Sequence, residues 1–320
     1  MSSEIFDGIR RGTARVMNQA RSVSIDARAL EALARSHDLL APSPPLDPID
    51  YYVGAPEATA AYILTLDAIN FGSGYFPCLA KRPGCSGYFT IAMSLRENWE
   101  TEGPWDAHRL AAMSADDCLR VMGQDPEVPE VAELMSLFSR ALNDLGEFLL
   151  KHFEGDPTGP IVAANRSAAC LAEILIEMPL YRDVSQYAGF EVPFYKRAQL
   201  TSADLAAVFK GEGYGAFTDL DQLTIFADNL VPHVLRREGV LVYAPALADR
   251  IDAGELLEPG SPDEVEIRAA AVHAVECCIS LMRNAGIQMT ARQLDTALWT
   301  WGQAPAMKAH PRHRARTTNY

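Results

Sequence analysis

Residues 217–236, FTDLDQLTIFADNLVPHVLR, place Asp228 and Asn229 in the middle of an apolar stretch, with Pro232 shortly after them. The apolar residues of 219–236 lie nearly all round a helical wheel, which predicts a helix buried inside the protein together with the Asp228 side chain. A buried carboxylate is either paired or raised in pKa. Such a group is typical of a catalytic acid or base.

Pro232 supplies a second irregularity, because it has no N–H to donate to the carbonyl of Asp228 four residues earlier. The helix therefore either kinks there or ends, and a new helix begins at Pro232. Both arrangements leave polar backbone beside Asp228 for a ligand. A purely structural alternative stays open, in which Asp228 caps the helix near Pro232, since Asp and Asn are preferred caps and Pro is preferred in the first turn.

Most of the chain around this segment has the apolar periodicity of helices. A small hairpin is expected at 184–194 around Gly189. Thr290 and Gln293 have the spacing of a capping box at the start of a further helix. Helices are expected in two short pieces within 15–40, the second capped by Ser24 or Asp26, and over 56–69, 131–153, 161–178, 195–210 and 264–286, with loops at 42–48 and 155–160. The fold class predicted is mainly α, with one small sheet.

Composition limits the function classes. The chain has 320 residues, is 48% hydrophobic and carries a net charge of −14, which argues against general binding to duplex nucleic acid. No apolar run of about 18 residues predicts a membrane span, and the N-terminus lacks a signal-peptide core, so a cytoplasmic location is expected. No CxxC pair, P-loop, HExxH, GxSxG or Rossmann fingerprint occurs. The basic segment 307–320 suits either a small anionic ligand or plain solvation.

Several stretches share their order with one known family. LDAINFGSGY, YRDV with FYKRAQ, FTDLDQLTIFADNLVPHVL, DEVEIRAA, LDTALW and PRHRARTTNY resemble the queuosine salvage family, over about residue 55 to the C-terminus. The resemblance implies one mainly helical domain over 1–320, partly similar to helix-hairpin-helix DNA glycosylases. It implies hydrolysis of the N-glycosidic bond of queuosine 5'-phosphate to queuine and ribose 5-phosphate. No cofactor, metal, membrane or nucleic acid polymer is implied as a partner, and the queuosine nucleoside is a further candidate substrate.

The resemblance also suggests roles for individual residues. Asp228 would stabilise the oxocarbenium-like transition state and orient the attacking water. Asn229 is a neighbouring candidate for substrate binding. Candidates for stacking on the base, with core packing as the alternative for each, are Phe71, Tyr75, Trp299 and Trp301. Candidates for accepting the amine of the substrate are Asp67, Asn70, Asp219 and Asp295. Candidates for holding the 5'-phosphate are Lys196, Arg197, His233, Arg237, Lys308, His313 and Arg314.

The sequence is also compatible with two other functions. A glycosylase acting on bases in DNA or tRNA would need a basic groove, which the charge of −14 disfavours. A non-catalytic protein that binds a modified nucleotide would have the same pocket and leave its ligand intact. The leaving base is a 7-deazapurine and lacks the N7 that purines protonate on departure, so the sequence does not identify the acid that assists it.

Overall fold

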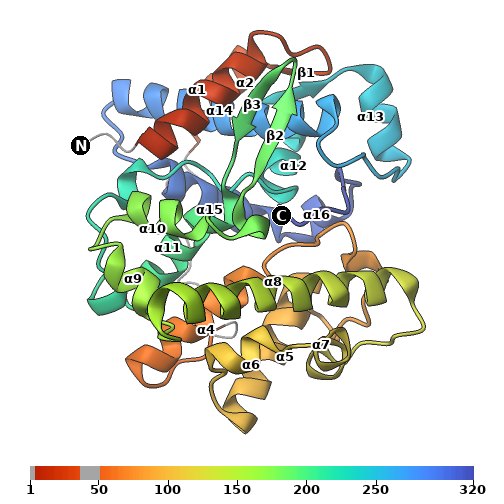
Figure 1. Cartoon of the computed structure of the whole chain (residues 1–320). Coiled ribbons are helices and arrows are strands. Elements are labelled where there is room, and N and C mark those ends of the chain that lie inside the picture. Colours follow the sequence, from red (N-terminus) through yellow and green to blue (C-terminus); the bar gives the residue numbers. More distant parts are fainter. Residues whose placement is uncertain (1–3, 37–50) are drawn as a thin grey trace. The chain divides into compact units, whose positions relative to one another are not determined.

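The computed structural model describes residues 4–36 and 51–320, which group into two compact units. The first unit contains residues 4–36, 183–196 and 219–316, and the second contains 51–182, 197–218 and 317–320. Each unit is mainly helical (Figure 1), which confirms the predicted fold class. The loop expected at 42–48 lies outside the described residues. A single domain over the whole chain stays a prediction.

In the first unit, two small antiparallel sheets accompany the helices. Strands β1 and β4 pair with Val23 opposite Tyr243, and β2 and β3 form the expected hairpin, with Tyr187 opposite Phe190. The hairpin turn places Ala188 and Gly189 at φ values of 46° and 83°. The elements are α1 (Glu4–Met17), β1 (Val23–Ile25), α2 (Ala27–Ala34), β2 (Val184–Tyr187), β3 (Phe190–Pro193), η5 (Leu220–Gln222), α12 (Leu230–Arg237), β4 (Leu241–Tyr243), α13 (Pro245–Asp252), α14 (Pro262–Asn284), α15 (Ala291–Gly302) and α16 (Pro305–Lys308).

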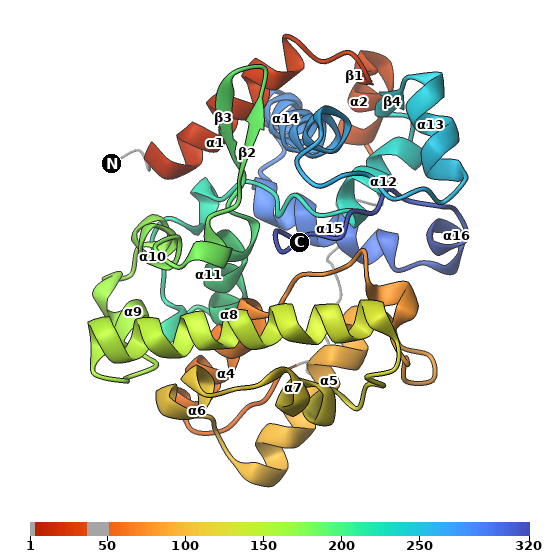
Figure 2. The ribbon, with the colours of Figure 1, turned by 45° about the vertical axis from the view of Figure 1, so that its right-hand side comes forward.

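Helix α14 is the centre of this unit, and Figure 2 views it almost end-on among α1, α12 and the strands. Most of its apolar residues are buried, and so is Glu266. One oxygen of Glu266 accepts the backbone N–H groups of residues 21–23 at 2.7–3.1 Å, and the other accepts the Tyr187 hydroxyl at 2.8 Å. A buried carboxylate is tolerated when it is fully hydrogen-bonded, so Glu266 fixes both sheets to the central helix.

The segment before α12 differs from its prediction. A helix over 219–229 is wrong: the chain makes one short 3-10 turn, η5, continues from Leu223 to Ala227 as neither helix nor strand, and bends at Asp228. Burial was predicted correctly, since all five residues of 223–227 are buried. The following helix begins at Leu230, so Pro232 lies in its first turn, where no intrahelical N–H is required.

The second unit is built from helices and short 3-10 turns. Helix α8 (Pro129–Phe153) is the longest of this unit, and Gly146 on it lies so close to α6 (Ala107–Ala111) that a Cβ there would be 2.6 Å from the Ala107 carbonyl oxygen. The single helix expected over 161–178 is wrong, because Asn165 and Arg166 adopt left-handed φ values of 47° and 64° and separate two helices. The elements are α4 (Pro56–Ala68), η2 (Phe76–Cys78), α5 (Gly87–Glu102), α6 (Ala107–Ala111), α7 (Ala115–Met122), α8 (Pro129–Phe153), α9 (Gly159–Ala163), α10 (Ala168–Leu175), η3 (Pro179–Tyr181), α11 (Lys196–Val208), whose first residue belongs to the first unit, and η4 (Gly213–Gly215). Across residues 4–36 and 51–320, no helix is long and apolar enough to cross a membrane.

Candidate active site

Asp228 lies at the bend that starts α12, in the first unit. Its Oδ1 accepts the backbone N–H groups of Leu230 at 2.8 Å and Val231 at 3.1 Å, which is a helix cap. The side chain is half-buried, so the prediction of a deeply buried Asp228 is wrong. Within the described residues Oδ2 has no hydrogen-bond partner. Capping and chemistry are therefore compatible, because the cap fixes one oxygen and leaves the other for a ligand.

The deeply buried carboxyl group of this unit's candidate set is Asp295 on α15, whose residue exposure is 5%. Its Oδ1 accepts the backbone N–H of Phe226 at 2.9 Å, two residues before Asp228. Burial raises the pKa of Asp295 well above its usual range, and the charge of Asp228 raises it further, while the Phe226 N–H and the Lys196 ammonium oppose the shift. The two carboxyl groups thus lie at the same short stretch of chain, residues 226–228, but Asp228 is half-buried and Asp295 is almost fully buried.

Two cations balance these carboxyl groups. Lys196 at the start of α11 is 6% exposed, and its charge acts on Asp295. Arg312 in the basic segment is half-buried, and its pKa is lowered by burial, against the opposing effect of the Asp228 carboxylate. Arg312 was not among the residues assigned to the site from the sequence. The clue was its place in PRHRARTTNY, but nothing in the spacing distinguished it from Arg314.

The histidines His233 and His313 are both buried, at 2% and 1% exposure. The Nε2–H of His233 donates to the Met307 carbonyl at 2.9 Å. Burial lowers the pKa of His233, and burial together with Arg312 lowers that of His313 to about 3. Both imidazoles are therefore neutral near neutral pH, and they can offer hydrogen bonds to a substrate but no charge.

A buried ion pair fixes the backbone just before Asp228. Arg268 on α14 is fully buried and makes two bonds to the Asp183 carboxylate, at 2.9 and 2.6 Å. Its Nε donates to the Ala227 carbonyl at 3.0 Å, and Asp183 also accepts the Lys196 backbone N–H at 3.2 Å. The pair therefore links α14, the start of α11 and the Asp228 bend. The sequence signal was an arginine that follows three acidic residues in DEVEIRAAAV, at the start of a long helical pattern.

The remaining predicted residues of the first unit differ in their burial. Asn229 is buried and is the N-cap residue of α12, and Trp299, Trp301 and Asp219 are half-buried. Arg237 and Lys308 are exposed at helix ends. Arg314 donates to the Gly254 carbonyl at 3.1 Å.

Four predicted binding residues lie in the second unit, at the end of α4 and the turn after it. Asp67 is fully buried, and its Oδ1 is 3.4 Å from the Asn70 amide nitrogen. Phe71 and Tyr75 are both 2% exposed. Phe71 packs edge-on against Phe138, with ring centroids 5.2 Å apart, and Arg197 lies over its face, 4.8 Å from the centroid. The guanidinium of Arg197 also donates to the carbonyls of Ala68 and Leu180.

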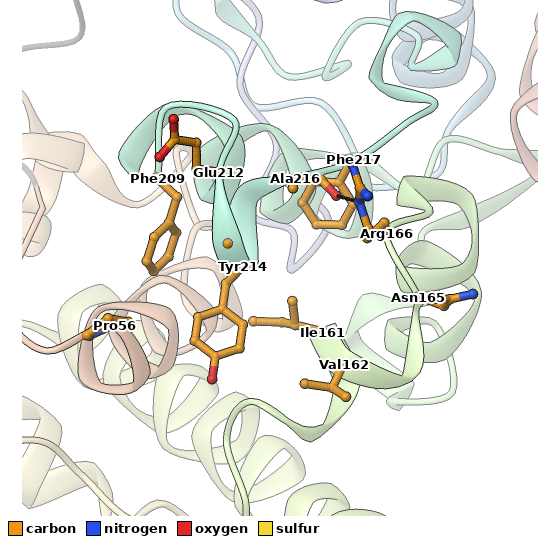
Figure 3. A pocket seen from close by; sticks show the side chains of 11 residues that line it. Pro56, Ile161, Val162, Asn165, Arg166, Phe209, Glu212, Tyr214, Ala216 and Phe217 are labelled. Carbon is orange, nitrogen blue, oxygen red and sulfur yellow. Dashed lines mark hydrogen bonds between the residues drawn. The ribbon is translucent and has the colours of Figure 1, made fainter.

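The second unit also contains a cavity of about 530 Å³ (Figure 3), lined by none of the predicted site residues. Aromatic and aliphatic side chains form its walls, and the Arg166 guanidinium lies beside Phe217 at one end, bonded to the Ala216 carbonyl at 3.3 Å. In residues 4–36 and 51–320, no group of three or more His, Cys, Asp or Glu side chains could hold a metal ion.

Comparison with known proteins identifies the family. A family model described as "Queuosine salvage protein" matches residues 51–320. The chain belongs to the queuosine salvage protein family. A relative from Sphaerobacter thermophilus is 38% identical over 98% of both chains, and one from Bos taurus is 32% identical over 83% of both. A third, from Dictyostelium discoideum, is 33% identical over 82% of this chain and 79% of its own. All three queuosine salvage relatives are named queuosine 5'-phosphate N-glycosylase/hydrolase.

Proposed function

We propose that this chain is an N-glycosidase that hydrolyses queuosine 5'-phosphate to queuine and ribose 5-phosphate, for queuine salvage into tRNA modification. Family membership supports the proposal, as does the shared name of three relatives that match 82–98% of the chain. A small-molecule nucleotide is therefore the expected partner. A cytoplasmic location and the lack of a nucleic acid polymer as substrate remain predictions from the sequence.

The observation that carries the chemistry is the position of Asp228. Its Oδ1 is fixed by two backbone N–H groups, so the carboxylate cannot swing away, and Oδ2 is left open. A fixed carboxylate beside the anomeric carbon stabilises the positive charge that develops in the oxocarbenium-like transition state. The same carboxylate accepts a proton from water as the water attacks that carbon. Asp228 thus combines electrostatic stabilisation with the role of general base.

The substrate's 5'-phosphate needs positive charge, and Arg312 is the strongest candidate in this unit. Its guanidinium is half-buried and lies within electrostatic reach of Asp228. Arginine binds phosphate through paired N–H donors and keeps its charge when partly buried. Lys308, Lys196, Arg237 and Arg314 remain candidates for the same group, whereas His233 and His313 are neutral and would act as hydrogen-bonding groups.

The test compares queuosine 5'-phosphate with the queuosine nucleoside in the wild type and in Arg312→Gln. We expect Arg312→Gln to raise KM for the 5'-phosphate by about 10- to 100-fold, equivalent to roughly 1.4–2.7 kcal/mol of lost charge-assisted bonding, and to change the nucleoside little. Arg283→Ala, at an exposed arginine at the end of α14, is the matched control. Equal losses on both ligands would mean that Arg312 supports the fold and not the phosphate.

A further inference from the structure

The hydrolysis has a requirement that Asp228 does not meet. As the C1'–N bond breaks, its electron pair goes to the base nitrogen, and the departing 7-deazapurine becomes far more stable if it gains a proton. Asp228 receives a proton from the attacking water, so it cannot also supply one in the same step. A second group must carry a proton into the reaction, and it must be protonated near neutral pH.

Asp295 has the geometry for that task. Its side chain is almost completely enclosed, and Oδ1 is held by the Phe226 N–H at 2.9 Å. Phe226 belongs to the short irregular segment 223–227 that leads into the bend at Asp228. Within the described residues Oδ2 has no hydrogen-bond partner. A neutral carboxylic acid has one O–H donor and an accepting oxygen; here Oδ1 accepts the Phe226 N–H, so the proton would sit on Oδ2.

We propose that Asp295 is the catalytic acid that protonates the departing base; this role rests on the function proposed above. The proton moves from Oδ2 of Asp295 to the base as the C1'–N bond breaks. The oxygen of water bonds to C1', and one water proton goes to Asp228. Asp295 ends ionised and Asp228 ends protonated, and exchange with solvent restores both. The net reaction consumes one water molecule and needs no other reactant.

The environment of Asp295 supports this division of labour. Burial raises the pKa of Asp295, and the neighbouring Asp228 carboxylate raises it further, because two adjacent carboxyl groups do not both ionise readily. Lys196 and the Phe226 N–H act in the opposite direction. A protonated Asp295 is a weak partner for the cationic amine of the substrate, which makes the alternative role of amine acceptor less favourable for this residue.

The experiment uses two substrates that differ only in the leaving group. Queuosine 5'-phosphate needs a proton on its base, whereas p-nitrophenyl β-D-ribofuranoside 5-phosphate releases a phenolate that departs without one. Asp295→Asn keeps an oxygen that accepts the Phe226 N–H and loses the transferable proton. We expect its kcat to fall at least about 100-fold on queuosine 5'-phosphate and less than about threefold on the p-nitrophenyl substrate. Asp228→Asn is the matched control and should lose activity on both.

Equal losses of Asp295→Asn on both substrates would overturn the assignment, as would full activity on queuosine 5'-phosphate. If Asp295→Asn does not fold, the pH dependence of kcat for the wild type provides a second test. Its kcat should decline at alkaline pH on queuosine 5'-phosphate, as Asp295 loses its proton, and stay level on the p-nitrophenyl substrate; parallel profiles would contradict the proposal. Failure of the wild type on both substrates would instead remove the proposed function itself.

Discussion

Removing Asp183 should destabilise the protein more than removing any surface carboxylate. Arg268 has no exposed side-chain surface, and Asp183→Ala would delete its bonds of 2.9 and 2.6 Å. Breaking a buried ion pair from one side costs about 3–5 kcal/mol, because the remaining charge stays buried without its partner. Glu264, whose carboxylate lies 3.8 Å from the Arg268 Nε, offsets part of this loss. We therefore expect the lower end, about 3 kcal/mol.

The assay is urea unfolding followed by circular dichroism, with thermal unfolding alongside. At an unfolding entropy of about 2.1 cal/mol/K per residue, a loss of about 3 kcal/mol lowers Tm by roughly 4–5 °C for a chain of this size. Asp252→Ala is the matched control, because Asp252 pairs with Arg236 at 3.0 Å but is 56% exposed. An exposed pair contributes about 0–1 kcal/mol.

The same variant should also affect catalysis. Arg268 holds the Ala227 carbonyl at 3.0 Å, so its displacement loosens the bend that carries Asp228. We expect kcat for queuosine 5'-phosphate to fall about 10- to 100-fold, as for a catalytic group displaced by about 1 Å. An Asp183→Ala protein as stable and as active as Asp252→Ala would refute the view that this pair fixes the site.

Further predictions concern the packing of α15 and the buried imidazole. Gly302→Ala should cost about 1–3 kcal/mol in urea unfolding, because a Cβ there would be 2.7 Å from the Leu230 Cγ and would force α15 away from α12; an unchanged midpoint would contradict this. The folded-state pKa of His313, about 3, lies below its unfolded value of about 6.5. Below about pH 6.5 the imidazole is therefore protonated in the unfolded chain but not in the folded one, and the stability decreases as the pH is lowered. We expect a loss of about 2 kcal/mol between pH 7 and pH 5 that is reduced in His313→Gln, and an equal loss in that variant would exclude His313 as the cause.

The long helices could be predicted closely from the sequence. Helix α14 was expected over 264–286 and spans Pro262–Asn284, and α8 was expected over 131–153 and spans Pro129–Phe153. An apolar stripe repeated over six turns leaves little choice of structure. The capping box of Thr290 and Gln293 was also correct, because its hydrogen bonds join residues only three positions apart.

The segment before Asp228 could not be predicted in this way. Its residues are apolar on all sides, so burial follows from composition, but a buried helix and a buried irregular segment have the same composition. The non-helical form is stabilised by a distant partner, since the Phe226 N–H donates to Asp295, 69 residues further along the chain. The relation of Asp228 to Arg312 and Asp295 is likewise a product of the fold. Local patterns contain no information about such contacts.

The most direct test of the central claim is hydrolysis of queuosine 5'-phosphate by the purified protein, with queuine detected by mass spectrometry and Asp228→Asn measured in parallel. Asn keeps an oxygen for the Leu230 and Val231 N–H groups, so the variant should fold and bind substrate. We predict queuine from the wild type and a loss of at least about 100-fold in kcat for Asp228→Asn. Tight binding of queuosine 5'-phosphate without any queuine from the wild type would contradict the account and indicate a protein that only binds the nucleotide.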